Sequence, residues 1–281
     1  VLRADVDWLG ATFMAGIPKT YRTLSRLAAL SRSLSMFFAI IITDVCQKRL
    51  PKGQKPFYLF QKKPGDHMVH IVYSGGDDLF LVGAWDDLLE MAVDLREAFR
   101  RYTNGKLSFS AGWGIFSPSY PVIRMAKDTG DLEELAKKIK KTKDSLALFG
   151  TAAEEGQVTP VFSWQDFQKN VCHEKLDFLL SHFYLEGIDK GEDSREKIPA
   201  GKSLLYRILE LLQAKPFNLA RFAYTLARLE PTRKGTTEAE KACYREIREK
   251  LYQWGRGSEE EQLALETALR LVIYRMRDKE D

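Results

Sequence analysis

A tight turn that carries two carboxylates separates two apolar segments in the first third of the chain. Residues 75–78 read Gly-Gly-Asp-Asp, and they lie between the strand-forming segments 70–74 and 79–83. Glycine adopts turn conformations that are closed to other residues, and runs of β-branched and aromatic residues favour strands. The sequence therefore predicts a β-hairpin with an acidic tip.

The acidic tip indicates a compensating positive charge, since aspartate is depleted in strands and costly to desolvate. A further strand is expected at residues 1–7, and it carries Asp5. If this strand pairs with the hairpin, Asp5 and Asp77 face each other at a distance suited to Mg²⁺. A divalent cation that holds a nucleoside triphosphate would supply the charge.

The order of the expected elements predicts an α+β, ferredoxin-like domain at residues 1–159. The elements are a strand at 1–7, a loop through Gly10 and Gly16, a helix at 20–48, the hairpin, a helix at 85–102, a strand at 107–116, two short helices at 120–126 and 131–141, and a strand at 145–149. This β-α-β-β-α-β order is the split βαβ plan, in which the first strand lies beside the hairpin.

Only helical periodicity follows, which predicts a small all-helical domain at residues 160–281. The helical segments are 164–183, 202–214, 218–229, 237–254 and 259–277. This domain has 21 basic and 21 acidic residues, whereas residues 1–159 have 22 basic and 18 acidic residues. So small a basic excess fits phosphate handling but does not by itself predict a nucleic-acid surface.

Composition excludes several other classes of protein. With 44% apolar and 29% charged residues, the 281-residue chain can bury the cores of two domains. No uninterrupted apolar run approaches the about 20 residues of a membrane span, and no signal peptide is evident, so we expect a cytoplasmic protein without a membrane partner. The three cysteines lie far apart, which excludes a self-contained zinc ribbon, and the four histidines show no ligand spacing. The chain begins inside the first expected strand, which predicts that it is part of a longer polypeptide.

Several motifs occur in a characteristic order. They are Asp5-Val6-Asp7, Ser25-Arg26, Ser31–Phe38, Tyr73–Asp78, Ser110–Phe116, Leu135–Lys138 and Lys143–Ser145. Over residues 1–149 this set resembles the second palm domain of the large subunit of type III CRISPR effector complexes, of the Csm class. Residues 160–281 resemble that subunit's C-terminal helical domain, by helicity and position alone.

The resemblance implies a nucleotide cyclase-like palm that makes cyclic oligoadenylate from ATP in antiviral defence, when target RNA binds the complex. It also implies partners: other subunits of the complex, guide RNA and target RNA bound through the complex, and the first palm domain of the same polypeptide. The family's HD nuclease is not expected from this chain, which contains no His-Asp dipeptide.

The resemblance further implies two-metal catalysis with Mg²⁺ or Mn²⁺. The implied catalytic residues are Asp77 and Asp78, and the implied metal ligands are Asp5, the Val6 carbonyl, Asp77 and Asp78, with Asp78 either completing the metal shell or orienting the attacking hydroxyl. The implied nucleotide contacts are Gly75 and Gly76 at the triphosphate, Ser31, Ser35 and Ser110 at the adenine, and Lys137, Lys138 and Lys143 at the β- and γ-phosphates.

Other interpretations of the same residues stay open. Two aspartates are common in turns, a lysine cluster can be a solvated helix face, and serines on a helix can be packing residues. A non-catalytic scaffold would bind nucleotide without turnover. A diguanylate-cyclase-like enzyme shares the palm and the turn, but the Asn and Asp pair that reads guanine is not evident between Leu9 and Pro18.

Overall fold

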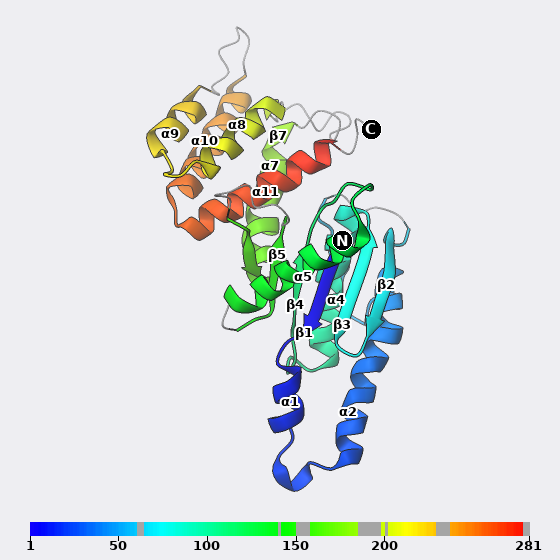
Figure 1. Cartoon of the computed structure of the whole chain (residues 1–281). Coiled ribbons are helices and arrows are strands. Elements are labelled where there is room, and N and C mark those ends of the chain that lie inside the picture. The colour runs from blue at the N-terminus through cyan, green and yellow to red at the C-terminus, as the bar shows by residue number, and fades with distance from the viewer. Residues whose placement is uncertain are drawn as a thin grey trace. The chain divides into compact units, whose positions relative to one another are not determined.

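Two units make up the chain, Val1–Trp164 and Gln165–Asp281, and each is described separately. The computed structural model describes residues 1–60, 65–139, 142–149, 158–184, 198–199, 202–228 and 237–277. Figure 1 shows the strands of the first unit and the helices of the second.

A six-stranded mixed sheet forms the centre of the first unit, in the order β2-β3-β1-β4-β5-β6. The strands are β1 (Leu2–Val6), β2 (Val69–Gly75), β3 (Asp78–Gly83), β4 (Phe109–Trp113), β5 (Ser145–Leu148) and β6 (Val161–Ser163). Strand β1 pairs antiparallel with both β3 and β4. The order β2-β3-β1-β4 is the ferredoxin-like one, so the predicted α+β fold is confirmed. Strand β6 lies beyond residue 159, and we propose that the boundary between the two domains follows Trp164.

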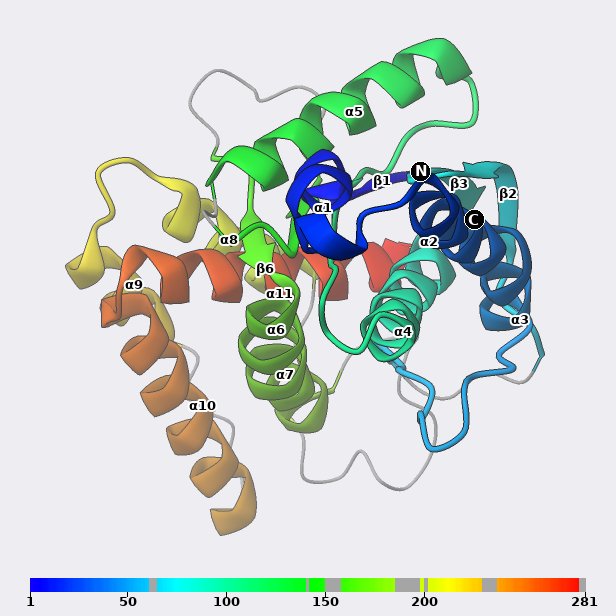
Figure 2. The same ribbon diagram turned by 90° about the horizontal axis from the view of Figure 1, so that it is seen from below.

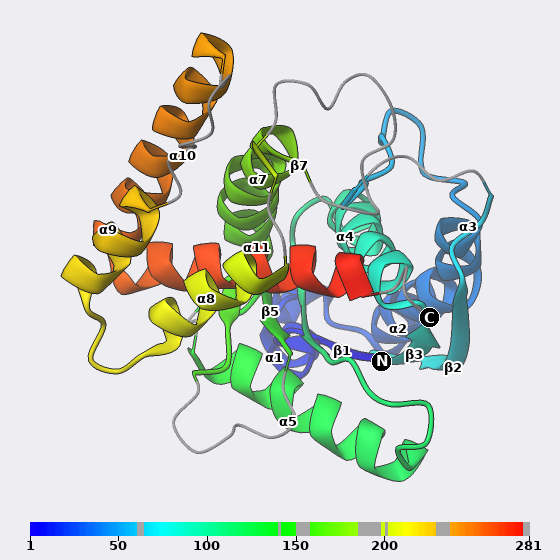
Figure 3. The ribbon, with the colours of Figure 1, turned by 90° about the horizontal axis from the view of Figure 1, so that it is seen from above.

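Helices cover both faces of this sheet. Along β1, alternate residues are buried on one face, while Arg3 and Asp5 are partly exposed on the other. Figures 2 and 3 show α4 (Trp85–Tyr102) and α5 (Val122–Ile139) on opposite sides of β1 and β3. Helix α5 thus lies over the face that carries Asp5.

Glycine allows α5 to lie directly on the sheet. A Cβ at Gly112 in β4 would lie 2.3 Å from the Thr129 carbonyl oxygen, and one at Gly130 would lie 3.0 Å from Arg3 Nη1. The prediction of two short helices here is wrong, because α5 continues through Thr129 and Gly130. Their weak helix propensity is offset by this close packing.

The segment between β1 and β2 is more helical than predicted. The expected loop after β1 contains α1 (Leu9–Ala15) and a 3₁₀ turn, η1 (Lys19–Tyr21). The long helix begins at Leu24 rather than residue 20, and it comprises α2 (Leu24–Met36), a π-helical segment η2 (Phe37–Ile41) and α3 (Ile42–Cys46).

The π-helical segment contacts the hairpin. The Ser74 hydroxyl of β2 donates to the Phe38 carbonyl oxygen at 2.6 Å, and the Phe37 ring packs 4.9 Å from that of Phe99 in α4. Within the described residues, Leu24–Cys46 is the one helical segment long and apolar enough to cross a membrane. Length and composition alone are weak evidence for a span, because core helices of soluble proteins and signal sequences meet the same criterion, and 28% of the most apolar 18-residue window is buried here.

The second unit is mainly helical, as predicted. Its elements are α6 (Trp164–Asp166, which begins in the first unit), the π-helical segment η3 (Phe167–Leu176), α7 (Asp177–His182), α8 (Lys202–Gln213), α9 (Leu219–Ala227), α10 (Glu238–Arg256) and α11 (Glu259–Arg277). A short parallel strand pair, β7 (Phe183–Tyr184) and β8 (Ile198–Pro199), was not predicted. Leu229, the expected end of one helix, lies outside the described residues.

Candidate active site

The hairpin turn meets the end of β1. In the antiparallel pairing of β1 with β3, Asp5 lies opposite Asp78. Gly76 has φ +66°, a conformation that favours glycine, and the Val6 amide donates to the Asp77 carbonyl oxygen at 3.2 Å. The fold therefore brings Asp5, Val6, Asp77 and Asp78 to one end of the sheet.

Two basic side chains, Lys137 and Arg3, pair with Asp5, Asp78 and Glu133. Lys137 of α5 donates to Asp5 Oδ2 and, at 2.7 Å, to Glu133 Oε1. Arg3 Nε lies 3.3 Å from Glu133 Oε2, and Arg3 Nη2 lies 3.7 Å from Asp78 Oδ2. Glu133 was not predicted as a site residue, although its position one helical turn before Lys137 was a usable signal.

The acids are held in surroundings that favour added positive charge. Partial burial raises the pKa of Asp77, the nearby charges of Asp5 and Asp78 raise it further, and Lys137 opposes the rise. Burial also raises the pKa of Glu133. For Lys137, burial acts to lower the pKa, but hydrogen bonds to Asp5 and Glu133 outweigh it and the pKa is raised. A metal cation bound among the carboxylates would favour their ionised forms.

The donor set fits a hard divalent cation. Three carboxylates and a carbonyl at the end of β1 are the oxygen ligands that Mg²⁺ and Mn²⁺ prefer. Asp5 and Asp78 lie in paired strands, so the sheet fixes their spacing, and Asp77 directly precedes Asp78 in the turn. Asp5 is paired with Lys137. The lysine ammonium can move to a phosphate group when a metal ion binds the carboxylate.

The three predicted lysines lie in different surroundings. Lys137 contacts Asp5, as described. Lys138 is exposed and pairs with Glu134 at 2.8 Å. The Lys143 ammonium lies over the Trp8 ring, 4.0 Å from its centre. Within the described residues, Lys137 is thus the one of the three that contacts a predicted metal ligand.

The predicted glycine and serine contacts also differ in their surroundings. Gly75 ends β2, and a Cβ there would lie 3.3 Å from the Tyr73 hydroxyl. Ser31 and Ser35 are exposed on α2, one helical turn apart. Ser110 is fully buried opposite Asp5 in the β1–β4 pairing, and its hydroxyl donates to Asp7 and accepts from the Ser145 amide.

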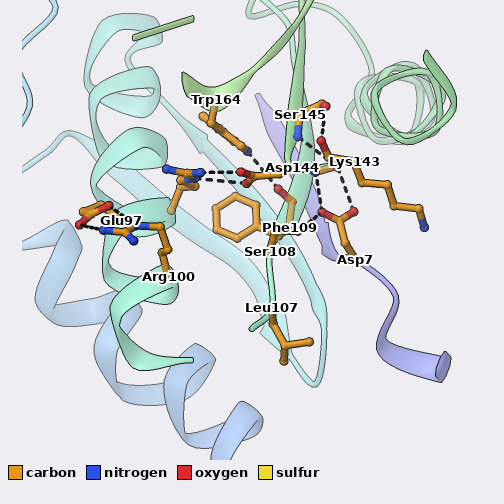
Figure 4. A network of polar contacts seen from close by, with 12 residues as sticks. Asp7, Glu97, Arg100, Leu107, Ser108, Phe109, Lys143, Asp144, Ser145 and Trp164 are labelled. Carbon is orange, nitrogen blue, oxygen red and sulfur yellow. Dashed lines mark hydrogen bonds and ion pairs between the residues drawn. The ribbon is translucent and has the colours of Figure 1, made fainter. Parts of the chain in front are cut away.

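Sequence reasoning missed a buried network behind the cluster, shown in Figure 4. Asp7 is 1% exposed and accepts hydrogen bonds from the Ser108 hydroxyl at 2.7 Å, the Ser110 hydroxyl at 2.9 Å and the Asp144 amide at 3.0 Å. Burial raises the pKa of Asp7, and these hydrogen bonds limit the rise. Asp144 in turn accepts from Arg96 Nε at 3.2 Å. The available signal was the pair of alternating serines, Ser108 just before β4 and Ser110 within it.

Three non-glycine residues beside this network have left-handed backbone conformations. Their φ angles are 58° for Trp8, 54° for Lys143 and 49° for Asp144. Such conformations cost about 1–3 kcal/mol each and persist where surrounding contacts impose them. They fix how the chain leaves β1 and enters β5.

The chain matches two families of known proteins. Residues 1–147 match Cas10/Cmr2, second palm domain, and residues 183–278 match the second helical domain of the CRISPR RNA silencing complex Cmr2 subunit. A curated relative from Enterococcus italicus, "CRISPR system single-strand-specific deoxyribonuclease Cas10/Csm1 (subtype III-A)", is 36% identical over 99% of this chain and 30% of its own length. The chain therefore spans about a third of such relatives.

Solved structures agree with these matches. A crystal structure of a Csm1–Csm4 cassette in complex with one ATP has a TM-score of 0.63 and 26% identity, over 97% of this chain and 35% of that chain. A Csm1–Csm4 cassette in complex with cA3 has a TM-score of 0.61 and 26% identity, over 94% of this chain and 35% of that chain.

Proposed function

The chain belongs to the Cas10/Cmr2 second palm family, and we propose that it joins ATP molecules into cyclic oligoadenylate within a type III CRISPR effector complex. The observation that carries this proposal is the cluster of Asp5, Asp77 and Asp78, faced by Lys137. The cassettes that bind ATP and cA3 support the choice of substrate and product class. We propose that target RNA switches the reaction on.

The proposed reaction is the attack of a ribose 3′-oxygen on the α-phosphorus of a second ATP. A phosphorus–oxygen bond forms, the bond to the β-phosphate bridge breaks, the hydroxyl loses its proton and pyrophosphate leaves. Two Mg²⁺ or Mn²⁺ ions, held by Asp5, Asp77, Asp78 and the Val6 carbonyl, would stabilise the attacking and leaving oxygens.

This chain's own residues perform the remaining tasks. Lys137 would pass from Asp5 to the β- and γ-phosphates as they arrive, and Lys138 and Lys143 would contribute charge nearby. Gly75 and Gly76 let the backbone approach the triphosphate. Ser31, Ser35 and Ser110 are the proposed adenine contacts, of which Ser110 would require a rearrangement of its bonds to Asp7 and Ser145.

We also propose a location and partners for the chain, based on those that the relatives suggest. The chain would act in the cytoplasm beside other subunits of the complex, with guide RNA, target RNA and the first palm domain of the same polypeptide. Csm1–Csm4 cassettes among the similar structures support a neighbouring subunit.

The test uses the complete complex assembled with guide RNA. It is incubated with ATP and Mg²⁺, with and without complementary target RNA, and products are resolved by mass spectrometry. We expect target-dependent cyclic adenylates that are lost on Asp77→Asn and kept on Asp131→Asn, an exposed carboxylate of α5. ATP left intact by a complex that still binds target would support the scaffold interpretation instead.

A further inference from the structure

A second group of metal-ligand side chains lies at the other end of the β2–β3 hairpin from the Gly-Gly-Asp-Asp turn. His67 comes two residues before β2, and Asp87 and Glu90 lie in the first turns of α4, which follows β3. One ligand atom from each residue lies within 4.8 Å of those of the other two. The three residues are 5%, 3% and 1% exposed, respectively. We call this group the base cluster.

Backbone amides fix the orientation of both carboxylates in the base cluster. The Met68 amide donates to Asp87 Oδ2 at 3.1 Å, and the Leu59 amide donates to Glu90 Oε1 at 2.8 Å. The other oxygen of Asp87, Oδ1, accepts no hydrogen bond within the described residues and lies 3.5 Å from His67 Nδ1. Outer hydrogen bonds of this kind orient the ligands of protein metal sites.

The charge of the base cluster points to a divalent cation. Two buried carboxylates are costly to keep ionised unless a cation balances their charge. One divalent ion balances them and leaves His67 neutral, the form in which imidazole binds metal.

The chemistry and spacing of the donors fit zinc. Imidazole nitrogen combined with carboxylate oxygen is a donor set that suits Zn²⁺ better than Mg²⁺ or Ca²⁺. Tetrahedral bonds of about 2.0–2.2 Å place neighbouring donors about 3.3–3.6 Å apart. The 3.5 Å between His67 Nδ1 and Asp87 Oδ1 is close to that value.

We propose that His67, Asp87 and Glu90 supply three ligands of a Zn²⁺ site that fastens the base of the hairpin to α4, with the fourth position open to water. The pairing of β2 with β3 begins at Val69 and Gly83, between the ligands. Zn²⁺ would join the segment that enters β2 to the helix that leaves β3, and would thereby hold the hairpin whose far end carries Asp77. This site is separate from the carboxylates at the turn and does not depend on the proposed reaction.

The test measures zinc binding by the whole chain. Protein stripped with EDTA is given one equivalent of Zn²⁺, and bound metal is counted by native mass spectrometry. Asp77→Asn reports any zinc taken by the turn, and His70→Gln is a matched control, because His70 is an exposed histidine three residues away. We expect one Zn²⁺ per chain in the wild type and in both of these variants, and at least a tenfold loss of affinity in His67→Gln and Asp87→Asn.

A spectrum keeps the proposal falsifiable if the cluster variants fail to fold. Co²⁺ in the wild type and in Asp77→Asn should give the strong visible absorption of a tetrahedral site, and Zn²⁺ should displace it. Absence of that absorption would overturn the proposal. Zinc retention by folded His67→Gln with unchanged affinity would overturn it as well.

Discussion

The two ends of the β2–β3 hairpin both carry acidic residues, but they hold them in opposite ways. At the turn, the side chains of Asp5 and Asp78 are 24% and 42% exposed and are paired with the side chains of Lys137 and Arg3. At the base, the acids are buried and accept hydrogen bonds from backbone amides.

We therefore interpret the turn as the catalytic site and the base cluster as a site that stabilises the fold. A lysine ammonium sits on a flexible stem, so it can leave a carboxylate when metal and phosphate arrive, because the metal then neutralises the carboxylate and the phosphate accepts from the lysine. A backbone amide stays where the fold puts it, and a buried amide that loses its acceptor costs about 1–3 kcal/mol. Substitutions at the turn should therefore affect activity, and those at the base should affect stability.

The largest effect is expected at the turn. Asp5→Asn should lower ATP turnover by the assembled complex at least 100-fold, about 3 kcal/mol in the barrier, because a metal ligand loses its charge. The free energy of unfolding should change by less than about 0.5 kcal/mol, because Lys137 keeps Glu133 as a partner. Product analysis and urea unfolding measure the two quantities. A parallel loss of both would make the turn structural and break the comparison.

At the base, Glu90→Ala should lower the free energy of unfolding by about 1–3 kcal/mol, because the buried Leu59 amide loses its acceptor. Glu134→Ala is the control, since Glu134 is exposed and pairs only with a surface lysine in the contacts described. It should leave the free energy of unfolding nearly unchanged. Urea unfolding followed by circular dichroism compares them, and equal effects would contradict the buried role of Glu90.

Between the two ends, the fit of α5 on the sheet can be tested with alanine. Gly112→Ala should destabilise the fold by about 1–2 kcal/mol, because its Cβ would overlap the α5 backbone, which also carries Lys137. Gly10→Ala meets nothing within 4 Å and should not destabilise α1. Thermal unfolding of both variants decides the point, and an unaffected Gly112→Ala would mean that α5 can shift freely.

Neighbouring lysines on α5 sharpen the assignment at the turn. Lys137→Ala should raise the KM for ATP about tenfold, a loss of about 1.4 kcal/mol, because its ammonium lies beside Asp5. Lys138→Ala should have the smaller effect, since its ammonium is exposed and paired with Glu134. Steady-state kinetics of the complex compare the two, and a larger effect of Lys138→Ala would relocate the phosphate contact.

The smallest effect concerns Glu97, a partly buried carboxylate on α4, the helix that carries Asp87 and Glu90. Hydrogen bonds from Arg100, and then from Arg101, lower the pKa of Glu97 to about 2. Because the folded-state pKa lies below the unfolded value, Glu97 stabilises the fold above about pH 4.5 and loses this effect as the pH falls towards 2. Glu97→Gln should therefore flatten acid unfolding in this range by less than about 1 kcal/mol. Acid titrations followed by circular dichroism test this, and unchanged curves would show that the pairs contribute nothing.

The sequence by itself determined the elements whose signals are local. Helix α4 occupies 85–102 as predicted, because apolar residues recur at helical spacing and Asn104-Gly105 follows it. The hairpin, the split βαβ order and the family resemblance were equally readable, and the sheet order and the family match confirm them. Helix α1 was missed because Gly10, Gly16 and Pro18 indicate a loop and none of its residues is buried.

Only the tertiary structure decided which charged and polar groups meet. No periodicity shows that Lys137 rather than Lys138 reaches Asp5, because that choice depends on how α5 rotates over the sheet. Ser110 looked like a pocket residue, but the sheet buries it against Asp7. The base cluster unites a histidine and a helix about 20 residues apart in the sequence, so it exists only once the segment before β2 packs on α4. Local patterns follow from backbone geometry and burial period, whereas contacts between distant side chains follow from packing, which no single segment encodes.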